Sequence, residues 1–199
     1  SGYIVIAPAW WGWQGRTGHL KRVGARDKCN VAQFAASMYG LNVLDLHIQD
    51  AQAAIDVLAA RPEVDATRIG CMGNSYGGRT AMWFTIFDER IAACVASGCM
   101  NTFRERSLKL SSCGIQFPHG LLRYADVHEL FCLIGPRPLQ LHAGRQDPLI
   151  TPADRDEIER TVRQAYRQFG SEQNLDYALH EEGHLLIWDL AEPFLRRHL

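Results

Sequence analysis

One short stretch decides the fold of this 199-residue chain: Gly73-Asn74-Ser75-Tyr76-Gly77-Gly78. The stretch fits the pattern G-x-S-x-G, in which a serine occupies a sharp turn between a strand and a helix. The preceding residues 67–72 predict a short strand, and residues 75–87 predict a helix. Such a turn exposes the serine hydroxyl at its tip. We expect a side chain at residue 73 or 77 to collide with the adjoining strand and helix, so both positions require glycine.

The composition is typical of a globular protein. The chain is 47% hydrophobic and 22% charged, with a formal net charge of -1. This charge gives no electrostatic reason to expect nucleic acid or an acidic membrane surface as a partner. No apolar run is long enough to span a membrane. The six cysteines lack metal-ligand spacing, which favours reduced, buried thiols and slightly favours the cytoplasm, although an even count permits disulfides.

Predicted strands and helices alternate along the chain. Apolar runs predict buried strands over residues 3–7, 67–72, 91–97 and 139–143, and an alternating pattern predicts an edge strand over 175–179. Helical spacing predicts helices over residues 27–38, 46–60, 75–87, 121–133, 154–169 and 185–199. This alternation is typical of an α/β fold with a parallel sheet. Residues 98–121 follow no pattern, and we expect them to form an insertion over the active site.

Two later loops provide the groups that a serine nucleophile needs. A serine hydroxyl requires a base within hydrogen-bond reach, and the base requires a third group that fixes its tautomer. Asp147 follows the predicted strand 139–143, and His184 lies between the last predicted strand and the last helix. The order serine, acid, histidine is that of the α/β-hydrolases. The sequence therefore predicts Ser75, Asp147 and His184 as a catalytic triad.

Other titratable residues fit these roles less well. His142 is predicted inside a strand and His180 at a strand end, where we expect core or structural histidines. Asp154 and Asp156 fall at the start of a predicted helix and suit capping or helix-dipole roles. For the motif alone, a glycine-rich turn without chemistry is the alternative interpretation.

Ester cleavage also requires backbone donors for an oxyanion and a surface for the substrate. The N–H of Tyr76 is expected to be one donor, because it follows the nucleophile. No loop that supplies a second donor can be identified in the sequence. A glycine-broken loop carries Trp10, Trp11 and Trp13, which form either an aromatic wall for an apolar or sugar-like substrate or a packing cluster beneath a neighbouring loop. His119, in the predicted insertion, is a further candidate at the border of the site.

Several segments resemble a known family. Residues 2–8 and 61–70, which lead into the turn at 73–78, resemble the dienelactone hydrolase and acetyl xylan esterase-like branch of the α/β-hydrolases. Residues 120–126 and 133–139 are similar to the acetyl xylan esterase and glucuronoyl esterase relatives of that branch. The resemblance covers essentially the whole chain. It implies one α/β-hydrolase domain over residues 1–199, in a mostly parallel eight-stranded sheet that this chain enters near the fourth strand, with the N-terminal part missing.

The resemblance implies a hydrolase of carboxylic esters that uses no metal or cofactor and forms an acyl-enzyme. Dienelactone hydrolases proper use a cysteine nucleophile, so Ser75 points to the serine esterases of the group. The expected partner is a small-molecule or carbohydrate ester, and no nucleic acid or membrane is expected. Two alternatives remain open: a serine peptidase of the prolyl oligopeptidase type, and a binding module or inactive fragment with an incomplete oxyanion hole.

Overall fold

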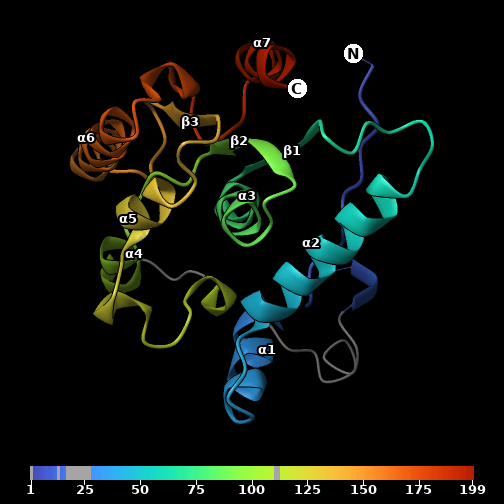
Figure 1. Ribbon diagram of the computed structural model, residues 1–199. Coiled ribbons are helices and arrows are strands. Elements are labelled where there is room, and N and C mark those ends of the chain that lie inside the picture. Colours follow the sequence, from blue (N-terminus) through green and yellow to red (C-terminus); the bar gives the residue numbers. More distant parts are fainter. Residues whose placement is uncertain (1, 13, 17–27, 110–112) are drawn as a thin grey trace. The chain divides into compact units, whose positions relative to one another are not determined.

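The computed structural model describes residues 2–12, 14–16, 28–109 and 113–199 (Figure 1). Within these ranges the chain forms two compact parts. The first part comprises residues 1–66 and 110–121, and the second comprises residues 67–109 and 122–199. No helix within the described ranges is long and apolar enough to cross a membrane.

The first part is built around two helices. Its elements are the 3-10 turns η1 (Gln14–Arg16) and η3 (Gly114–Gln116) and the helices α1 (Lys28–Ser37) and α2 (Val43–Ala59). Helix α2 begins earlier than the predicted residue 46. The reason is a cap, because the N–H of Asn42 donates to a carboxylate oxygen of Asp45 at 3.2 Å. A carboxylate in the first turn also interacts favourably with the helix dipole.

The predicted strand over residues 3–7 is wrong. The structure places no strand there, and the side chain of Val5 is 80% exposed. A strand requires a neighbouring strand that pairs with its N–H and C=O groups. An apolar run predicts burial, but it does not supply that neighbour, and none pairs with these residues in the part of the chain that the structure describes.

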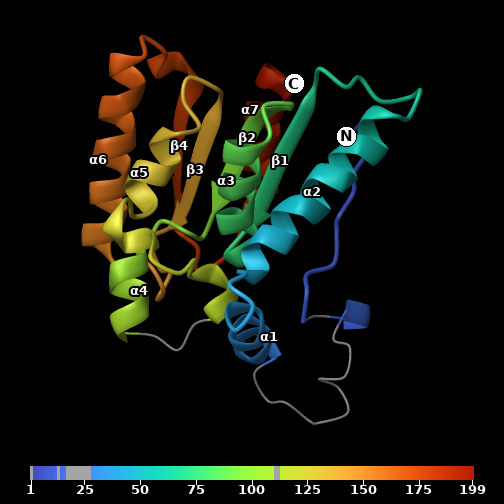
Figure 2. The ribbon, with the colours of Figure 1, turned by 60° about the horizontal axis from the view of Figure 1, so that its bottom comes forward.

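The second part contains a four-stranded parallel sheet. Its strands are β1 (Ile69–Asn74), β2 (Ile91–Ser97), β3 (Leu139–Gly144) and β4 (Leu175–His180). They lie side by side in the order β1-β2-β3-β4, and each adjacent pair is parallel (Figure 2). The carboxyl ends of all four strands therefore meet at one edge, which is where ligands bind in open α/β sheets.

Helices cover both faces of this sheet. They are α3 (Tyr76–Phe87), α4 (Phe103–Lys109), α5 (Val127–Cys132), α6 (Pro152–Gln168) and α7 (Trp188–His198). Figure 1 shows α3 and α7 on opposite faces of the strands. A Cβ at Gly70 would meet Leu195 of α7 and Leu199, which directly follows it, so the helix packs directly on β1. The predicted α/β fold with a parallel sheet flanked by helices is thus confirmed.

The region from residue 98 to residue 133 differs from its sequence pattern in two places. The segment 98–121, predicted to be irregular, contains helix α4 and turn η3, whereas its position over an active site stays a prediction. The helix predicted over 121–133 is divided into a 3-10 turn, Leu121–Arg123, and the helix α5. Asp126 causes the break, because its carboxylate accepts the N–H of Val127 at 2.7 Å and caps α5.

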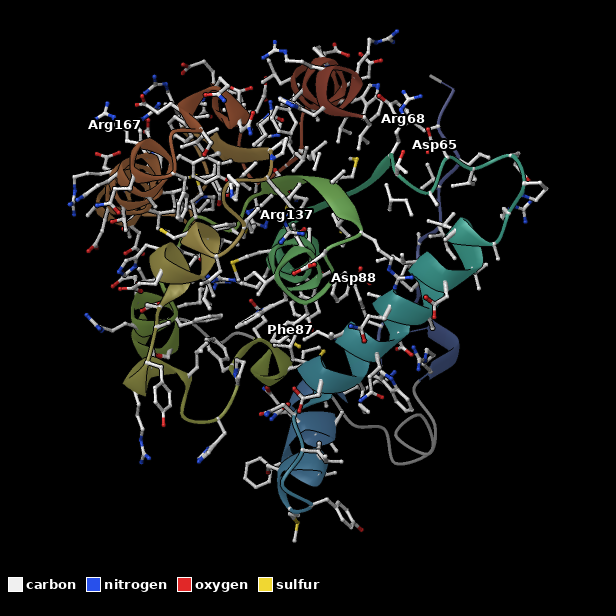
Figure 3. The ribbon with its side chains drawn as sticks, in the orientation of Figure 1. Asp65, Arg68, Phe87, Asp88, Arg137 and Arg167 are labelled. Carbon is white, nitrogen blue, oxygen red and sulfur yellow. The ribbon has the colours of Figure 1, made fainter. Side chains whose placement is uncertain are left out.

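The far end of α3 is fixed by one arginine. The guanidinium of Arg137 donates to the carbonyl oxygens of Asp88 at 3.0 Å and Ile91 at 3.1 Å, and also to that of Thr85 (Figure 3). These carbonyls lie at the end of α3 and the start of β2. A cation at this position satisfies carbonyl groups that lack a helical partner. The contact holds the helix whose other end follows Ser75.

Candidate active site

Ser75 occupies a strained turn between β1 and α3. Its backbone has φ 61° and ψ -121°, and within the described ranges it is the one non-glycine residue with positive φ. An L-residue rarely adopts this conformation, and such strain collects at functional sites. The N–H of Ser75 donates to the carbonyl oxygen of Ser97, at the end of β2, at 2.8 Å. The strand, turn and helix that the motif requires are therefore present.

The glycines of the turn have different roles. A Cβ at Gly73 would lie 2.3 Å from the carbonyl carbon and oxygen of Gly77, and a Cβ at Gly78 would lie 2.4 Å from the carbonyl oxygen of Ser97. Apart from its chain neighbours and the adjacent backbone of α3, no heavy atom of the described residues comes within 4 Å of a Cβ at Gly77. The predicted collision is confirmed at residue 73 and is wrong at residue 77, because the first turn of α3 directs that position into open space.

This difference gives a matched pair of variants. Gly73→Ala is expected to lower the free energy of unfolding by about 3 kcal/mol, because backbone atoms must move to admit the methyl group. Gly77→Ala is expected to change it by less than about 1 kcal/mol, and in the stabilising direction, since alanine favours the helix. Urea unfolding followed by circular dichroism measures both values. Equal losses in the two variants would contradict the assignment of the tight contact to residue 73.

His184 and Asp147 are in direct contact. The Nδ1 atom of His184 lies 2.6 Å from Oδ2 of Asp147, and the other carboxylate oxygen accepts the N–H of Leu149 at 2.9 Å. The Asp147 side chain is buried, whereas the His184 side chain is about one quarter exposed, at 24%. A buried carboxylate beside Nδ1 holds the proton on that nitrogen and leaves Nε2 as an acceptor.

The two loops that carry these residues are joined by their backbones. The backbone N–H of Arg145 donates to the carbonyl oxygen of His180 at 2.8 Å, and the backbone N–H of Gln146 donates to the carbonyl oxygen of Glu182 at 3.2 Å. A Cβ at Gly144 would lie 2.2 Å from the carbonyl oxygen of Gly183. The loop after β3 and the loop after β4 thus pack without intervening side chains.

The loop that carries Asp147 is also tied to α3, the helix that follows Ser75. Arg79, one turn into α3, is 2% exposed, and its guanidinium donates to the carbonyl oxygen of Asn101 at 3.0 Å. The side-chain amide of Asn101 in turn donates to the carbonyl oxygen of Leu149 at 2.9 Å. Burial lowers the pKa of Arg79 to about 10. The guanidinium therefore remains charged at neutral pH, and it links α3 to the segment beside Asp147.

The imidazole of His184 lies next to the backbone of Ser75. A Cβ at Gly98 would be 3.1 Å from Cε1 of His184 and 3.2 Å from the backbone nitrogen of Ser75. The imidazole and the Ser75 backbone therefore lie close to the same position. The Nε2 atom of His184 is buried and has no hydrogen-bond partner among the described residues. The structure therefore brings Ser75, Asp147 and His184 to the same edge of the sheet. Their catalytic roles stay a prediction.

The competing residues have structural surroundings. His142 is fully buried in β3, and His180 lies at the end of β4 with its ring centroid 5.5 Å from that of His142. The carboxylate of Asp154 accepts the N–H and the hydroxyl of Thr102 at 3.3 and 3.2 Å. Asp156 is exposed and pairs with Arg155. The predicted positions of the two histidines within and at the end of a strand are confirmed.

The buried imidazole of His142 predicts a loss of stability in acid. Burial lowers the pKa of His142 from its usual 6.5 to about 4. Between pH 6.5 and about pH 4, this histidine is protonated in the unfolded chain but neutral in the folded protein. The free energy of unfolding therefore decreases as the pH falls through this window. We expect His142→Gln to reduce that decrease in urea titrations at pH 7 and pH 4.5. An equal decrease in the free energy of unfolding in both proteins would show that His142 is not its cause.

The expected oxyanion donor lies at the start of α3. Tyr76 is the first residue of the helix, directly after Ser75. Its N–H therefore lies at the positive end of the helix dipole, which favours a developing negative charge. The role of Tyr76 stays a prediction, as does the identity of a second donor.

The tryptophan loop belongs to the first part of the chain. The backbone N–H of Trp11 donates to Nε2 of His47 at 3.0 Å, and the ring centroid of Trp10 lies 4.9 Å from that of His47. The guanidinium of Arg16 lies over the ring of Trp11, 4.3 Å from its centroid, and pairs with Asp50. The two described tryptophans therefore pack on α2. Asp50, a residue of α2, forms this ion pair.

The remaining predicted substrate residues are less defined. His119 also belongs to the first part, where its N–H donates to the side-chain oxygen of Asn42 at 3.2 Å. Trp13 lies outside the described residues. A substrate-binding role for Trp10, Trp11, Trp13 and His119 stays a prediction.

Two positions beside the predicted triad were missed in the sequence. Ser97 and Gly98 end β2 next to Ser75 and His184, and Gly98 has φ 62°. A serine and a glycine directly after a buried apolar strand are a signal for such a site, since strand ends line the ligand edge of a parallel sheet.

Sequence comparisons identify related proteins. A model of the Dienelactone hydrolase family matches residues 1–171. The Bacillus subtilis (strain 168) protein named "Putative hydrolase YtaP" is 29% identical over 174 residues, which are 85% of this chain and 55% of that protein.

Two solved structures illustrate the shared fold. The structure named "putative acetyl xylan esterase" from Bacteroides fragilis NCTC 9343 matches 94% of this chain and 57% of its own, with a TM-score of 0.71 and 14% identity. A CE15 glucuronoyl esterase from Teredinibacter turnerae T7901 matches 79% of this chain and 47% of its own, with a TM-score of 0.66 and 23% identity. The chain thus spans about half the length of these relatives.

Proposed function

This chain belongs to the dienelactone hydrolase family, and on that premise we propose that it hydrolyses carboxylic esters with Ser75 as the nucleophile. His184 acts as the general base, and Asp147 orients it and stabilises its charged form. One observation carries the proposal: His184 Nδ1 lies 2.6 Å from a buried carboxylate, beside a serine held at φ 61°. Acid, base and strained serine are the parts from which this class of site is recognised.

The proposed reaction has two halves. In the first, Nε2 of His184 takes the hydroxyl proton as Oγ of Ser75 attacks the ester carbonyl, and the proton then passes to the departing alcohol. In the second, His184 takes a proton from water as the water oxygen attacks the acyl carbonyl. The proton then passes to Oγ of Ser75 as its bond to the acyl group breaks, which releases the carboxylic acid and the free serine. The carboxylate of Asp147 keeps the Nδ1 proton in place throughout, so Nε2 alone exchanges protons with the reactants.

The tetrahedral intermediate of each half carries a negative oxygen. The N–H of Tyr76 is the proposed donor from this chain, because it directly follows the nucleophile at the start of α3. A preorganised donor aimed at this oxygen is worth roughly 10²–10³ in kcat.

The proposed substrate class is an esterified carbohydrate. Structures that share the fold are named as an acetyl xylan esterase and a glucuronoyl esterase, which supports an ester linkage as the reacting group and a sugar as one half of the substrate.

Hydrolysis of p-nitrophenyl acetate by the purified protein tests the proposed function. We expect release of p-nitrophenol by the unsubstituted protein and a rate about 10⁶-fold lower by Ser75→Ala. A prolyl p-nitroanilide serves as the comparison substrate. Cleavage of the anilide in preference to the ester would favour a peptidase and contradict the proposal.

A further inference from the structure

The carboxyl end of β2 touches both halves of the proposed active site. The carbonyl oxygen of Ser97 accepts the N–H of Ser75 at 2.8 Å, and Gly98 lies against the imidazole of His184. Ser97 is fully buried, so its hydroxyl must be satisfied by protein groups. The atoms that satisfy it belong to the segment before the nucleophile and to the segment after the base.

The hydroxyl of Ser97 faces two acceptors. It donates to the side-chain oxygen of Asn74 at 2.9 Å and lies 3.3 Å from the carbonyl oxygen of Leu185. Asn74 is the variable residue directly before Ser75 in the motif, and Leu185 directly follows His184. One buried hydroxyl therefore bridges the residues that flank the nucleophile and the base.

Asn74 completes this bridge from the other side. Its amide nitrogen donates to the carbonyl oxygen of His184 at 3.3 Å, while its amide oxygen accepts from Ser97. Asn74 and Ser97 are register partners in the parallel ladder of β1 and β2, so their side chains leave the same face of the sheet. The two side chains and the backbone of residues 184–185 thus form one continuous hydrogen-bonded unit.

The backbone of His184 requires such support. His184 lies in a loop between β4 and α7, outside helices and strands. Contacts of that loop with residues 145 and 146 fix it to the acid, and the contacts with Asn74 and Ser97 fix it to the nucleophile. Gly98 leaves space for the imidazole, because a Cβ there would lie 2.6 Å from the Asn74 side-chain oxygen and 3.1 Å from Cε1 of His184.

We propose that Asn74 and Ser97 are positioning residues, which set the distance between His184 and Ser75 without touching the substrate. This inference rests on the proposed function of the triad. A base must approach its nucleophile to hydrogen-bond distance, and a misplacement of about 1 Å can cost about 10²-fold in rate. Loss of the Asn74–Ser97 link leaves the Asp147–His184 pair intact but releases that pair from the serine.

The test is the rate at which a fluorophosphonate probe labels Ser75, identified by the mass of the labelled peptide. For Asn74→Ala and for Ser97→Ala we expect a rate constant about 10²-fold lower at pH 7.5, with a single cooperative unfolding transition in urea. With p-nitrophenyl acetate, kcat falls and KM is unchanged, which a merely structural role would not produce. The double variant is expected to lose about the same factor as each single variant, because both residues belong to one hydrogen-bonded unit that either substitution disrupts.

A matched control removes a similar bond elsewhere in the same part of the chain. The amide of Asn174 also donates to a backbone carbonyl, that of Pro136 at 2.8 Å, but precedes β4 at the opposite end of the sheet. Asn174→Ala is expected to be labelled at the unsubstituted rate. Labelling of folded Asn74→Ala at the unsubstituted rate would overturn the inference and leave the proposed function intact. A folded, unsubstituted protein that is not labelled at all would overturn both, and Ser97→Ala decides the question if Asn74→Ala does not fold.

Discussion

Ser75→Ala is expected to lower kcat for p-nitrophenyl acetate about 10⁶-fold, which leaves only the residual rate that binding and the oxyanion donors supply. The substitution removes the oxygen that forms the acyl-enzyme, and neither His184 nor Asp147 can replace it. The backbone is expected to retain its fold, because the contacts of residue 75 in the structure are made by its N–H and carbonyl oxygen with Ser97 and Arg79. Alanine at φ 61° carries the same strain as serine, so stability should change little.

The control for this variant is another serine of the same part. Ser107 lies on α4, is exposed, and donates its hydroxyl to the carbonyl oxygen of Arg104 at 3.0 Å. Ser107→Ala should therefore keep full activity. Retention of more than about one thousandth of the activity by folded Ser75→Ala would exceed the residual that binding and the oxyanion donors supply, and would identify a different nucleophile.

Asp147→Asn is expected to lower kcat about 10⁴-fold with little change in structure. The oxygen that accepts the N–H of Leu149 is kept as the amide oxygen, so the amide nitrogen must face Nδ1 of His184. That nitrogen is a donor, and Nδ1 therefore becomes an acceptor. The proton moves to Nε2, where it blocks removal of the hydroxyl proton from Ser75. The loss arises from the wrong tautomer rather than from a displaced ring.

Kinetics and structure together check this prediction. A nuclear magnetic resonance spectrum of the imidazole nitrogens is expected to show the proton on Nδ1 in the unsubstituted protein and on Nε2 in Asp147→Asn. Asp156→Asn serves as the control, because Asp156 is an exposed residue of α6 that pairs with Arg155. Equal activities of Asp147→Asn and the unsubstituted protein would remove Asp147 from the triad and return Asp154 to consideration.

The sequence predicted strands well where the residues alone determine them. β2 was predicted over residues 91–97 and spans Ile91–Ser97, because its apolar run is bounded by a charged turn and by Gly98. β1 begins and ends two residues later than predicted. Gly73 and Asn74 have low strand propensity, but their pairing with β2 extends the strand to Asn74. Propensity is local, whereas the end of a strand depends on its partner.

The same distinction applies to the site. The loops of Asp147 and His184 could be predicted, since each follows a strand and the order of the three residues is fixed along the chain. The link between Asn74 and Ser97 could not, because it depends on the register of two strands whose residues are 23 positions apart. The open space at Gly77 likewise depends on the direction of the first turn of α3.

If the proposed hydrolase activity is confirmed, the pairing of Asn74 with Ser97 also makes that activity a measure of correct sheet assembly. A slip of β2 by one residue against β1 would turn every side chain of the strand to the opposite face. Ser97 would then point away from residues 184–185, and a chain with the wrong alignment would be compact but unable to bring the proposed base and nucleophile together. The specific activity of a preparation is therefore expected to be proportional to the fraction of molecules in which these two strands are paired correctly. Spectroscopic measures of secondary structure do not distinguish the two alignments.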